Sequence, residues 1–316
     1  MKKKFLFAKT WIEYAGFLFV RSIARILPYA WAGGLGAALG GFVYRCTSIR
    51  KRVTMENLSK AFPEKPEREI RRIALGAFRN YGRTILEMFW EWSAPTERIR
   101  SIVHLINPEI ARNALQDHKG VIILSGHFGS WELLLASSYF TVNRPMTAIV
   151  QRQRNKKIDA IVDKNRSRFE LHTVEMGQSV REALLCLKSE GVLFLLGDQS
   201  GSKESVYVPF FGRPAATHRG PAAFALKTGA HLVLEFLVRR EDGGYDVYFE
   251  EVDHSDLKGS SEEHIVELTR RHSAMLERYI RAHPDLWLWM HKRWKHTPYY
   301  EEKLREKPEA LDRTTA

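Results

Sequence analysis

Cysteine is scarce in this sequence, and the two cysteines belong to no recognisable motif. Cys46 and Cys186 stand far apart among 316 residues. This pattern excludes a disulfide framework and a cysteine-based metal site, and it fits a reducing compartment. The chain also lacks a Gly-x-Ser-x-Gly elbow, which argues against a serine esterase.

Acidic residues are scarce near the N-terminus. Residues 1–60 hold eleven Lys or Arg but only two acids, Glu13 and Glu56, and this excess is most of the net charge of +12. A basic surface favours anionic partners, such as an anionic bilayer, a phosphorylated substrate or nucleic acid. The apolar residues between these charges favour the bilayer.

No uninterrupted apolar run reaches the roughly 20 residues that a membrane-spanning helix needs. An apolar block over residues 5–20 is followed by Arg21 and Arg25, and residues 30–44 are uncharged but short and rich in glycine. We predict membrane-anchoring helices over residues 1–48, either spanning or lying at the interface, with basic flanks on the cytoplasmic side. A cleaved signal peptide and a buried pair of soluble helices are the alternatives, although no small-x-small cleavage site follows the first block.

The remainder of the chain alternates between helical and strand patterns. Residues 50–95 show apolar residues at helical spacing, interrupted at Pro63 and Pro66. Strands are expected at residues 120–125, 146–150, 192–196, 231–238 and 245–250, and helices at 131–140, 156–170, 179–189, 217–228 and 262–282. We predict an α/β domain over residues 49–300, with a mixed, mainly parallel sheet flanked by helices, and a polar tail over residues 301–316.

The segment that carries chemistry follows the first of these strands and reads Ser125-Gly-His-Phe-Gly-Ser-Trp-Glu132. The carboxyl end of a strand is the usual place for a site in an open α/β sheet. His127 and Glu132 would diverge on one continuous helix, so they can meet only if His127 lies in the loop and Glu132 in the first helical turn. Glu132 would then orient the imidazole, which would act as general base on a substrate hydroxyl. A purely structural histidine is the alternative, and the spacing does not match a zinc helix.

Five blocks in order resemble the lipid A biosynthesis lauroyl/myristoyl acyltransferases, from about Arg45 to Lys295. The blocks are HFGSWE, Arg52 with Asn57-Leu58 and Ala61-Phe62-Pro63-Glu64, Gly197-Asp198-Gln199, Pro209-Phe210-Phe211-Gly212 with Thr217, and Trp287 to Lys295. The resemblance implies a glycerolipid acyltransferase-like fold in which His127 is the base and Glu132 its partner.

The resemblance also implies roles for residues outside the first block. Asp198 and Gln199 would line the site near the acceptor, although a strand-end turn is the alternative. Gly212 and Thr217 would shape a loop over the acyl donor, with a turn and a helix cap as the alternative. Arg152 would bind phosphate, unless it belongs to a solvated run of charges. The basic and tryptophan-rich segment 287–295 suits contact with lipid head groups, and packing in the core is its alternative.

The predicted function is transfer of a fatty acyl chain from an acyl thioester to a hydroxyl of a lipid A precursor or related glycolipid. The donor would be acyl carrier protein, whose acidic surface suits a basic enzyme, or coenzyme A. We expect action at the cytoplasmic face of the cell inner membrane, with no metal, no cofactor and no nucleic-acid partner. The alternatives are an acyl-thioester hydrolase, a phospholipid or mannosylated phosphoinositide as acceptor, and a non-enzymatic membrane or nucleic-acid-binding module.

Overall fold

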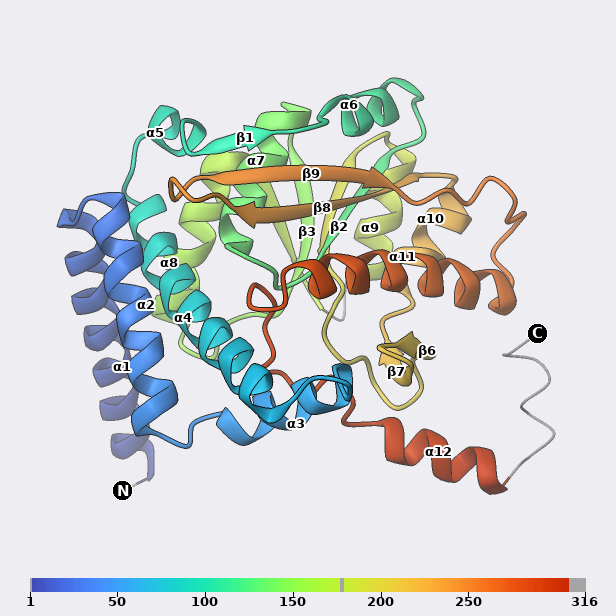
Figure 1. Cartoon of the computed structure of the whole chain (residues 1–316). Helices are drawn as coiled ribbons and strands as arrows, with labels where there is room; N and C mark the ends of the chain where they lie inside the picture. Colours follow the sequence, from blue (N-terminus) through green and yellow to red (C-terminus); the bar gives the residue numbers. More distant parts are fainter. Residues whose placement is uncertain (1, 177–178, 307–316) are drawn as a thin grey trace.

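A seven-stranded sheet forms the centre of the molecule (Figure 1), whose computed structural model describes residues 2–176 and 179–306. Across the sheet the strands are β1 (Val103–Leu105), β9 (Tyr245–Glu251), β8 (His231–Arg239), β2 (Val121–Ser125), β5 (Val192–Leu196), β3 (Met146–Val150) and β4 (Leu171–Glu175). Every neighbouring pair is parallel except β8 and β9, which are antiparallel. The predicted mixed, mainly parallel sheet is therefore confirmed.

Helices surround the sheet, and residues 2–100 form helices before the first strand begins. They are α1 (Lys2–Ile26), α2 (Tyr29–Cys46), α3 (Lys51–Ala61), α4 (Glu67–Glu91), α5 (Thr96–Arg100), α6 (Glu109–Gln116), α7 (Trp131–Val142), α8 (Lys156–Arg166), α9 (Ser179–Lys188), α10 (Gly220–Thr228), α11 (Glu262–Ala282) and α12 (Thr297–Glu306). A separate hairpin joins β6 (Val206–Phe210) to β7 (Arg213–Thr217). The predicted helix at 156–170 is shorter than expected, and β4 follows it as a strand that the sequence did not indicate.

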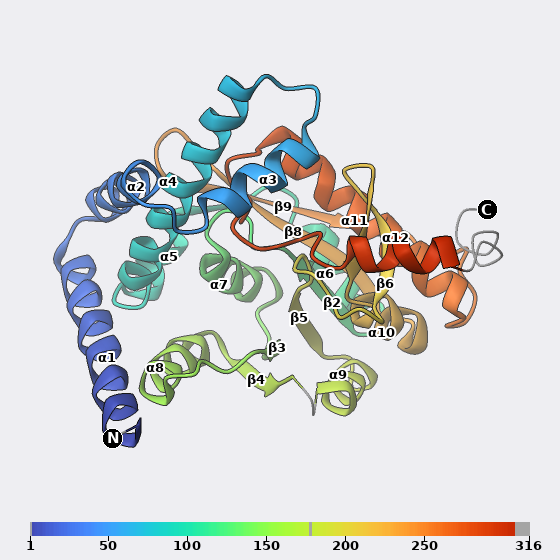
Figure 2. The ribbon, with the colours of Figure 1, turned by 90° about the horizontal axis from the view of Figure 1, so that it is seen from below.

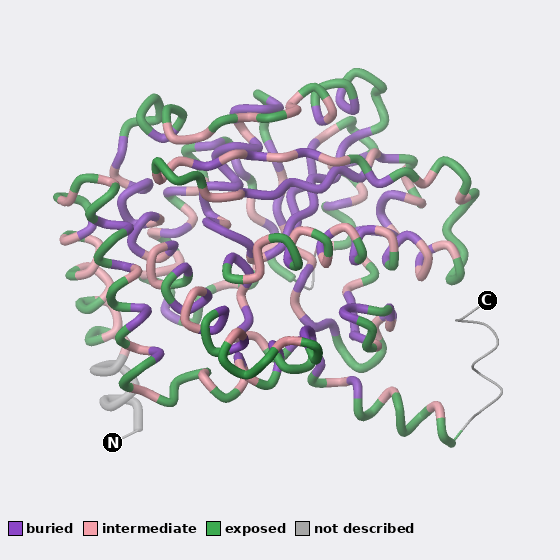
Figure 3. The backbone as a smooth tube through the Cα atoms, in the orientation of Figure 1, coloured by how far each residue is buried: buried purple, intermediate pink, exposed green. Residues whose placement is uncertain are grey.

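Both faces of the sheet are covered, so its central strands are apolar on both sides. Successive residues of β2 alternate between the faces: Ile122 packs in the core beneath α9, α10 and α11, and Ile123 packs beneath α6 and α7. In Figure 2, α7 and α11 lie on opposite sides of β8. Figure 3 shows the buried backbone concentrated in these strands. All five residues of β2 are buried, which holds the end of this strand in a fixed position.

The N-terminal residues are helical as predicted, but the prediction of a membrane anchor is wrong. Among the helices of residues 2–176 and 179–306, none is long and apolar enough to cross a membrane. Glu13, Arg21 and Arg25 interrupt α1. The helix α2 instead buries a face of small residues against α4, where a Cβ atom on Gly36 would lie 2.4 Å from the carbonyl oxygen of Gly82. The two backbones are in direct contact, so this face is already occupied by protein.

The C-terminal segment returns to the core. Trp287, Trp289 and Trp294 are each at most 4% exposed. Of the two interpretations of this segment, packing in the core is the one that the structure supports for its tryptophans. The return also places this segment beside the end of β2, where an isolated bridge joins Phe128 to Trp287.

Candidate active site

The junction between β2 and α7 has the strand–loop–helix form that the sequence predicts. His127 lies in the loop, and Glu132 lies in the first turn of α7. Gly129 adopts a left-handed φ of 61°, and a Cβ atom there would lie 2.7 Å from the carbonyl oxygen of Leu237. At Gly126 a Cβ atom would lie 3.0 Å from the Asp198 side chain. The two glycines therefore allow the loop to pass close to its neighbours.

The carboxylate that contacts His127 is that of Asp198. Nδ1 of His127 lies 2.8 Å from Oδ1 of Asp198, and the backbone N–H of His127 donates to Oδ2 at 2.8 Å. Trp287 also donates its indole N–H to Oδ2, at 2.8 Å. Asp198 is 3% exposed and follows β5, the parallel neighbour of β2. Three donors thus fix one buried carboxylate against the imidazole.

This pairing changes the proton affinities of both side chains. Burial lowers the pKa of His127, but the Asp198 carboxylate outweighs burial, and with help from Glu132 the pKa lies above its usual value. Burial works against the Asp198 carboxylate too, yet the charge of His127 and the hydrogen bonds from His127 and Trp287 lower the pKa of Asp198 to about 2. Asp198 is therefore ionised at neutral pH, and it stabilises a proton on the imidazole.

The second ring nitrogen of His127 faces a groove. With Nδ1–H donating to Asp198, Nε2 of a neutral imidazole is an acceptor. The side-chain amide nitrogen of Gln199 lies 3.4 Å from Nε2, and the Trp131 ring centroid lies 5.5 Å from that of His127. Gln199 thus lies beside the second ring nitrogen of His127.

Glu132 lies in the same groove, where its partner is Arg166. Arg166 donates from Nη2 to Oε1 at 2.5 Å and from Nε to Oε2 at 3.2 Å. The Glu132 side chain is 8% exposed and that of Arg166 is 21% exposed, so this bidentate pair is largely buried. Glu132 therefore acts on His127 through its charge, while the hydrogen bond to Nδ1 belongs to Asp198.

The groove has a volume of about 650 Å³ and an extended apolar wall. Its walls come from α1, α4, α7, α8, β3 and β5. The apolar lining includes Phe17, Ile85, Met88, Phe89, Trp92, Trp131, Leu135, Ala148, Val150, Ile158, Val162, Leu171, Phe194 and Leu196. The groove is also lined by polar and ionisable side chains, namely Tyr81, His127, Glu132, Gln151, Gln153, Arg166, Gln199 and His218. A long apolar ligand can thus lie beside a paired histidine.

The remaining candidates occupy other positions. Arg152 forms an ion pair with Asp163 and lies 3.8 Å from Asp159, so carboxylates already neutralise it. Gly212 sits in the two-residue turn between β6 and β7 with φ of 69°, a conformation that glycine adopts readily. Thr217 ends β7, is buried, and accepts a hydrogen bond from Arg293 at 2.6 Å.

Three contacts of this site were not predicted from the sequence. Asp198 accepts a hydrogen bond from Nδ1 of His127, Trp287 donates to Asp198, and Arg166 binds Glu132. A signal for the first was present, because Asp198 follows a buried strand as His127 does. Parallel strands end at the same edge of a sheet, so the two residues would meet if their strands were neighbours. No local pattern distinguishes Arg166. Trp287 belongs to the tryptophan-rich segment 287–295, but nothing in that segment indicated a contact with Asp198.

Comparison with known proteins finds similar sequences over nearly the whole chain. A family model described as bacterial lipid A biosynthesis acyltransferase matches residues 1–296. The lipid A biosynthesis lauroyltransferase of Escherichia coli (strain K12) is 26% identical over 296 residues, which cover 93% of this chain and 94% of that protein. The lipid A biosynthesis palmitoleoyltransferase of the same organism is 24% identical over 306 residues, which cover 96% and 97%. These matches confirm the predicted resemblance and the predicted enzyme class, acyltransferase. The chain belongs to the bacterial lipid A biosynthesis acyltransferase family.

Proposed function

We propose that this protein transfers a fatty acyl chain from an acyl thioester to a hydroxyl of a lipid A precursor or related glycolipid. The observation that carries the proposal is the position of His127, whose Nε2 atom faces an apolar groove while Asp198 holds Nδ1. By their names, the relatives reported above are a lauroyltransferase and a palmitoleoyltransferase of lipid A biosynthesis. A base beside an apolar groove is the arrangement that such a transfer needs.

In the proposed reaction, Nε2 of His127 removes the proton of the acceptor hydroxyl. The oxygen attacks the thioester carbonyl, a C–O bond forms, and the C–S bond then breaks. The thiolate that leaves takes the proton from the imidazolium, so the histidine returns to its neutral form. Asp198 stabilises the imidazolium in between, because its carboxylate accepts the Nδ1 proton in a hydrogen bond.

The start of α7 would stabilise the negative charge on the carbonyl oxygen. No side-chain hydrogen bond caps this helix at Ser130, and Trp131 and Glu132 of its first turn line the groove. The first N–H groups of a helix lack partners within the helix, so they can donate to an oxyanion. Glu132 would add a carboxylate that favours the imidazolium, with Arg166 fixing its position.

The groove would hold the acyl chain. Each methylene group that leaves water for an apolar wall contributes about 0.8 kcal/mol. The wall lies beside His127, so a chain lying along it would bring its thioester end to the base. We propose acyl carrier protein or coenzyme A as the carrier of this thioester.

The acceptor is a lipid, and we propose that the reaction takes place at the cytoplasmic face of the cell inner membrane.

The test is transfer of a radiolabelled acyl chain from acyl carrier protein or coenzyme A to a panel of lipids that includes lipid A precursors. The native protein is compared with His127→Ala. The matched control is His104→Ala, because His104 also pairs with an aspartate, at 3.0 Å from Asp246, but is exposed. We expect acceptor-dependent ester formation that His127→Ala abolishes and His104→Ala preserves. Equal acyl release with and without acceptor would instead identify a thioester hydrolase.

A further inference from the structure

Behind Asp198, on the side of the sheet opposite the groove, there is a small cavity. Its volume is about 10 Å³, close to the roughly 10–15 Å³ that a single water molecule needs. Asp198, Ser125, His272, Ser273 and Arg293 contribute polar groups to a wall that is otherwise apolar. His127 lines the groove and Asp198 lines this cavity, so the carboxylate separates the two spaces.

Two buried nitrogen atoms at this cavity have no hydrogen-bond partner among residues 2–176 and 179–306. They are Nε of Arg293 and Nε2 of His272, in side chains of residues that are 1% and 4% exposed. Leaving a buried polar group without a partner costs about 1–3 kcal/mol. Both groups line a space of the right size for one water, and a buried water that makes two to four hydrogen bonds would remove this cost.

Arg293 is an unusual buried cation. Its Nη1 donates to the carbonyl oxygen of Ala216 and its Nη2 to the hydroxyl of Thr217, each at 2.6 Å. Within the described ranges it forms no ion pair with a carboxylate at 4.0 Å or less, and Asp198 is the acid whose charge acts on it. Burial lowers the pKa of Arg293 to about 10, so it is still charged at neutral pH.

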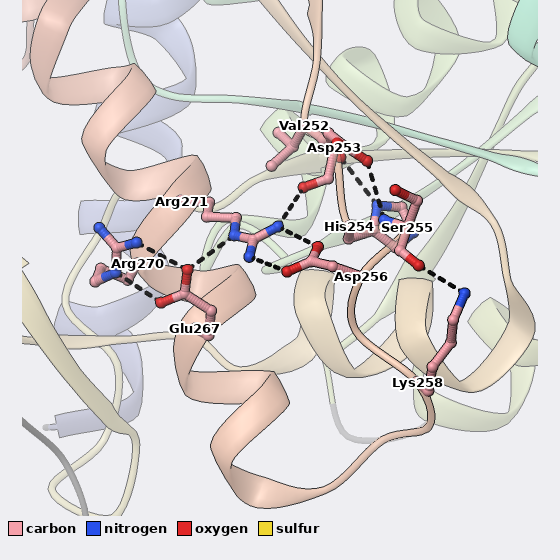
Figure 4. Close-up of polar contacts among 9 residues, drawn as sticks. All are labelled: Val252, Asp253, His254, Ser255, Asp256, Lys258, Glu267, Arg270 and Arg271. Carbon is pink, nitrogen blue, oxygen red and sulfur yellow. Dashed lines mark hydrogen bonds and ion pairs between the residues drawn. The ribbon is translucent and has the colours of Figure 1, made fainter. Parts of the chain in front are cut away.

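His272 supplies a fixed neutral partner. Burial and the charge of Arg293 lower the pKa of His272 to about 3. The neighbouring residue Arg271 ties α11 to the loop after β9, since it pairs with Asp256 of that loop at 2.6 Å (Figure 4). Glu267, one turn earlier on α11, holds the same guanidinium at 2.8 Å. This tie holds the helix in one rotation about its axis, with His272 directed into the protein.

We propose that a buried water molecule accepts a hydrogen bond from Nε of Arg293 and donates to Asp198 and to Nε2 of His272, which makes Arg293 a positioning residue for the His127–Asp198 pair. The effect of Arg293 on the reaction rests on the proposed function, whereas the bound water does not. A cation behind Asp198 stabilises the ionised carboxylate and opposes a proton on His127. It therefore counteracts the carboxylates that favour the imidazolium, and it keeps more of His127 in the basic form at neutral pH.

Other charged groups around the pair are accounted for. Glu132 from α7 favours the imidazolium, and Arg166 from α8 opposes it. His218 after β7 and His291 in the C-terminal segment also face Asp198, and burial lowers the pKa of both, that of His291 to about 4. These two histidines are thus largely neutral above pH 6.5, so a shift in the pH profile there reports on His127.

The experiment measures the rate of acyl transfer against pH, between about pH 6 and 9, for Arg293→Met and Arg293→Lys. We expect Arg293→Met to move the acidic midpoint of the profile upward by about one pH unit, because a nearby positive charge is lost. Arg293→Lys keeps the charge and should stay close to the native midpoint. The control is Arg239→Met, which removes another buried arginine, one that pairs with Glu87 at 2.7 Å away from this cavity. It should lower stability without moving the midpoint.

Two further measurements keep the proposal open to refutation if Arg293→Met does not fold. A crystal structure of the native protein should show ordered water density between Arg293, His272 and Asp198. A cavity without such density would overturn the proposal that a water molecule is bound there. His272→Leu removes one partner of the water and should shift the midpoint in the same direction by less. A native midpoint in every folded variant would overturn the positioning role. If the native protein transfers no acyl chain, the proposed function fails. The electron density would still show whether a water molecule is bound in the cavity.

Discussion

Nδ1 of His127 lies 2.8 Å from Oδ1 of Asp198 although 71 positions separate the two residues along the chain. The parallel pairing of β2 with β5 produces this proximity, because it aligns Ser125 with Leu196 and so brings the ends of the two strands together.

Asp198→Asn should reduce acyl transfer by about 10²–10⁴-fold, since an amide cannot stabilise the imidazolium and favours the wrong tautomer. Asparagine has nearly the shape of aspartate, so thermal stability should change little by comparison. Initial rates at saturating donor measure the effect. Glu132→Gln is the comparison and should cost less. The reverse ranking would show that Glu132, rather than Asp198, is the acid that activates His127.

Glu132→Gln or Arg166→Gln should each lower the free energy of unfolding by about 3 kcal/mol, because each leaves a largely buried charge without its partner. The double variant should be more stable than the sum of the two losses predicts. Urea denaturation measures all three variants. Glu262→Gln is the control, since its pair with Arg219 is exposed and should contribute less than about 1 kcal/mol. Additive losses at Glu132 and Arg166 would argue against coupling.

Gly40→Ala should destabilise the protein by about 1–3 kcal/mol, because overpacking forces α2 away from α4. A Cβ atom on Gly40 would lie 2.0 Å from the carbonyl oxygen of Phe78. Gly34→Ala on the same helix is the matched control, because nothing lies within 4 Å of its Cβ position. Alanine there should raise stability by up to about 1 kcal/mol through helix propensity. Thermal unfolding of both variants checks this contrast, and equal effects would contradict the close packing.

Glu235→Gln should change how stability depends on pH. Glu235 is fully buried against Ser137 and Ser138, and burial raises the pKa of its carboxyl from 4.5 to about 8. The unfolded chain loses this proton first, so the native protein should lose stability as pH rises from about 4.5 to about 8. Glutamine cannot ionise and should flatten this part of the curve. Urea midpoints at pH 5, 6.5 and about 8 measure it, and parallel curves for the two proteins would refute the raised pKa.

Much of the local structure was predictable, because it depends on neighbours along the chain. The apolar run of residues 121–125 predicted a buried strand, and the glycines around His127 predicted a loop before a helix. The placement of His127 and Glu132 on opposite sides of that boundary followed from helical geometry. The strand β4 was missed because only two of its five residues are buried, at Leu171 and Val174, so its pattern resembles the end of the preceding helix.

The sequence by itself determined where the strands and helices lie, that they form a mainly parallel sheet, and that His127 stands at the end of a buried strand. Only the tertiary structure decided that Asp198 contacts Nδ1, that Arg166 binds Glu132, and that α2 packs on α4. Local periodicity reports which face of an element is apolar, whether that face meets lipid or protein. Strand order and helix docking depend on contacts between residues far apart in the chain, and those contacts select the partner of each polar group.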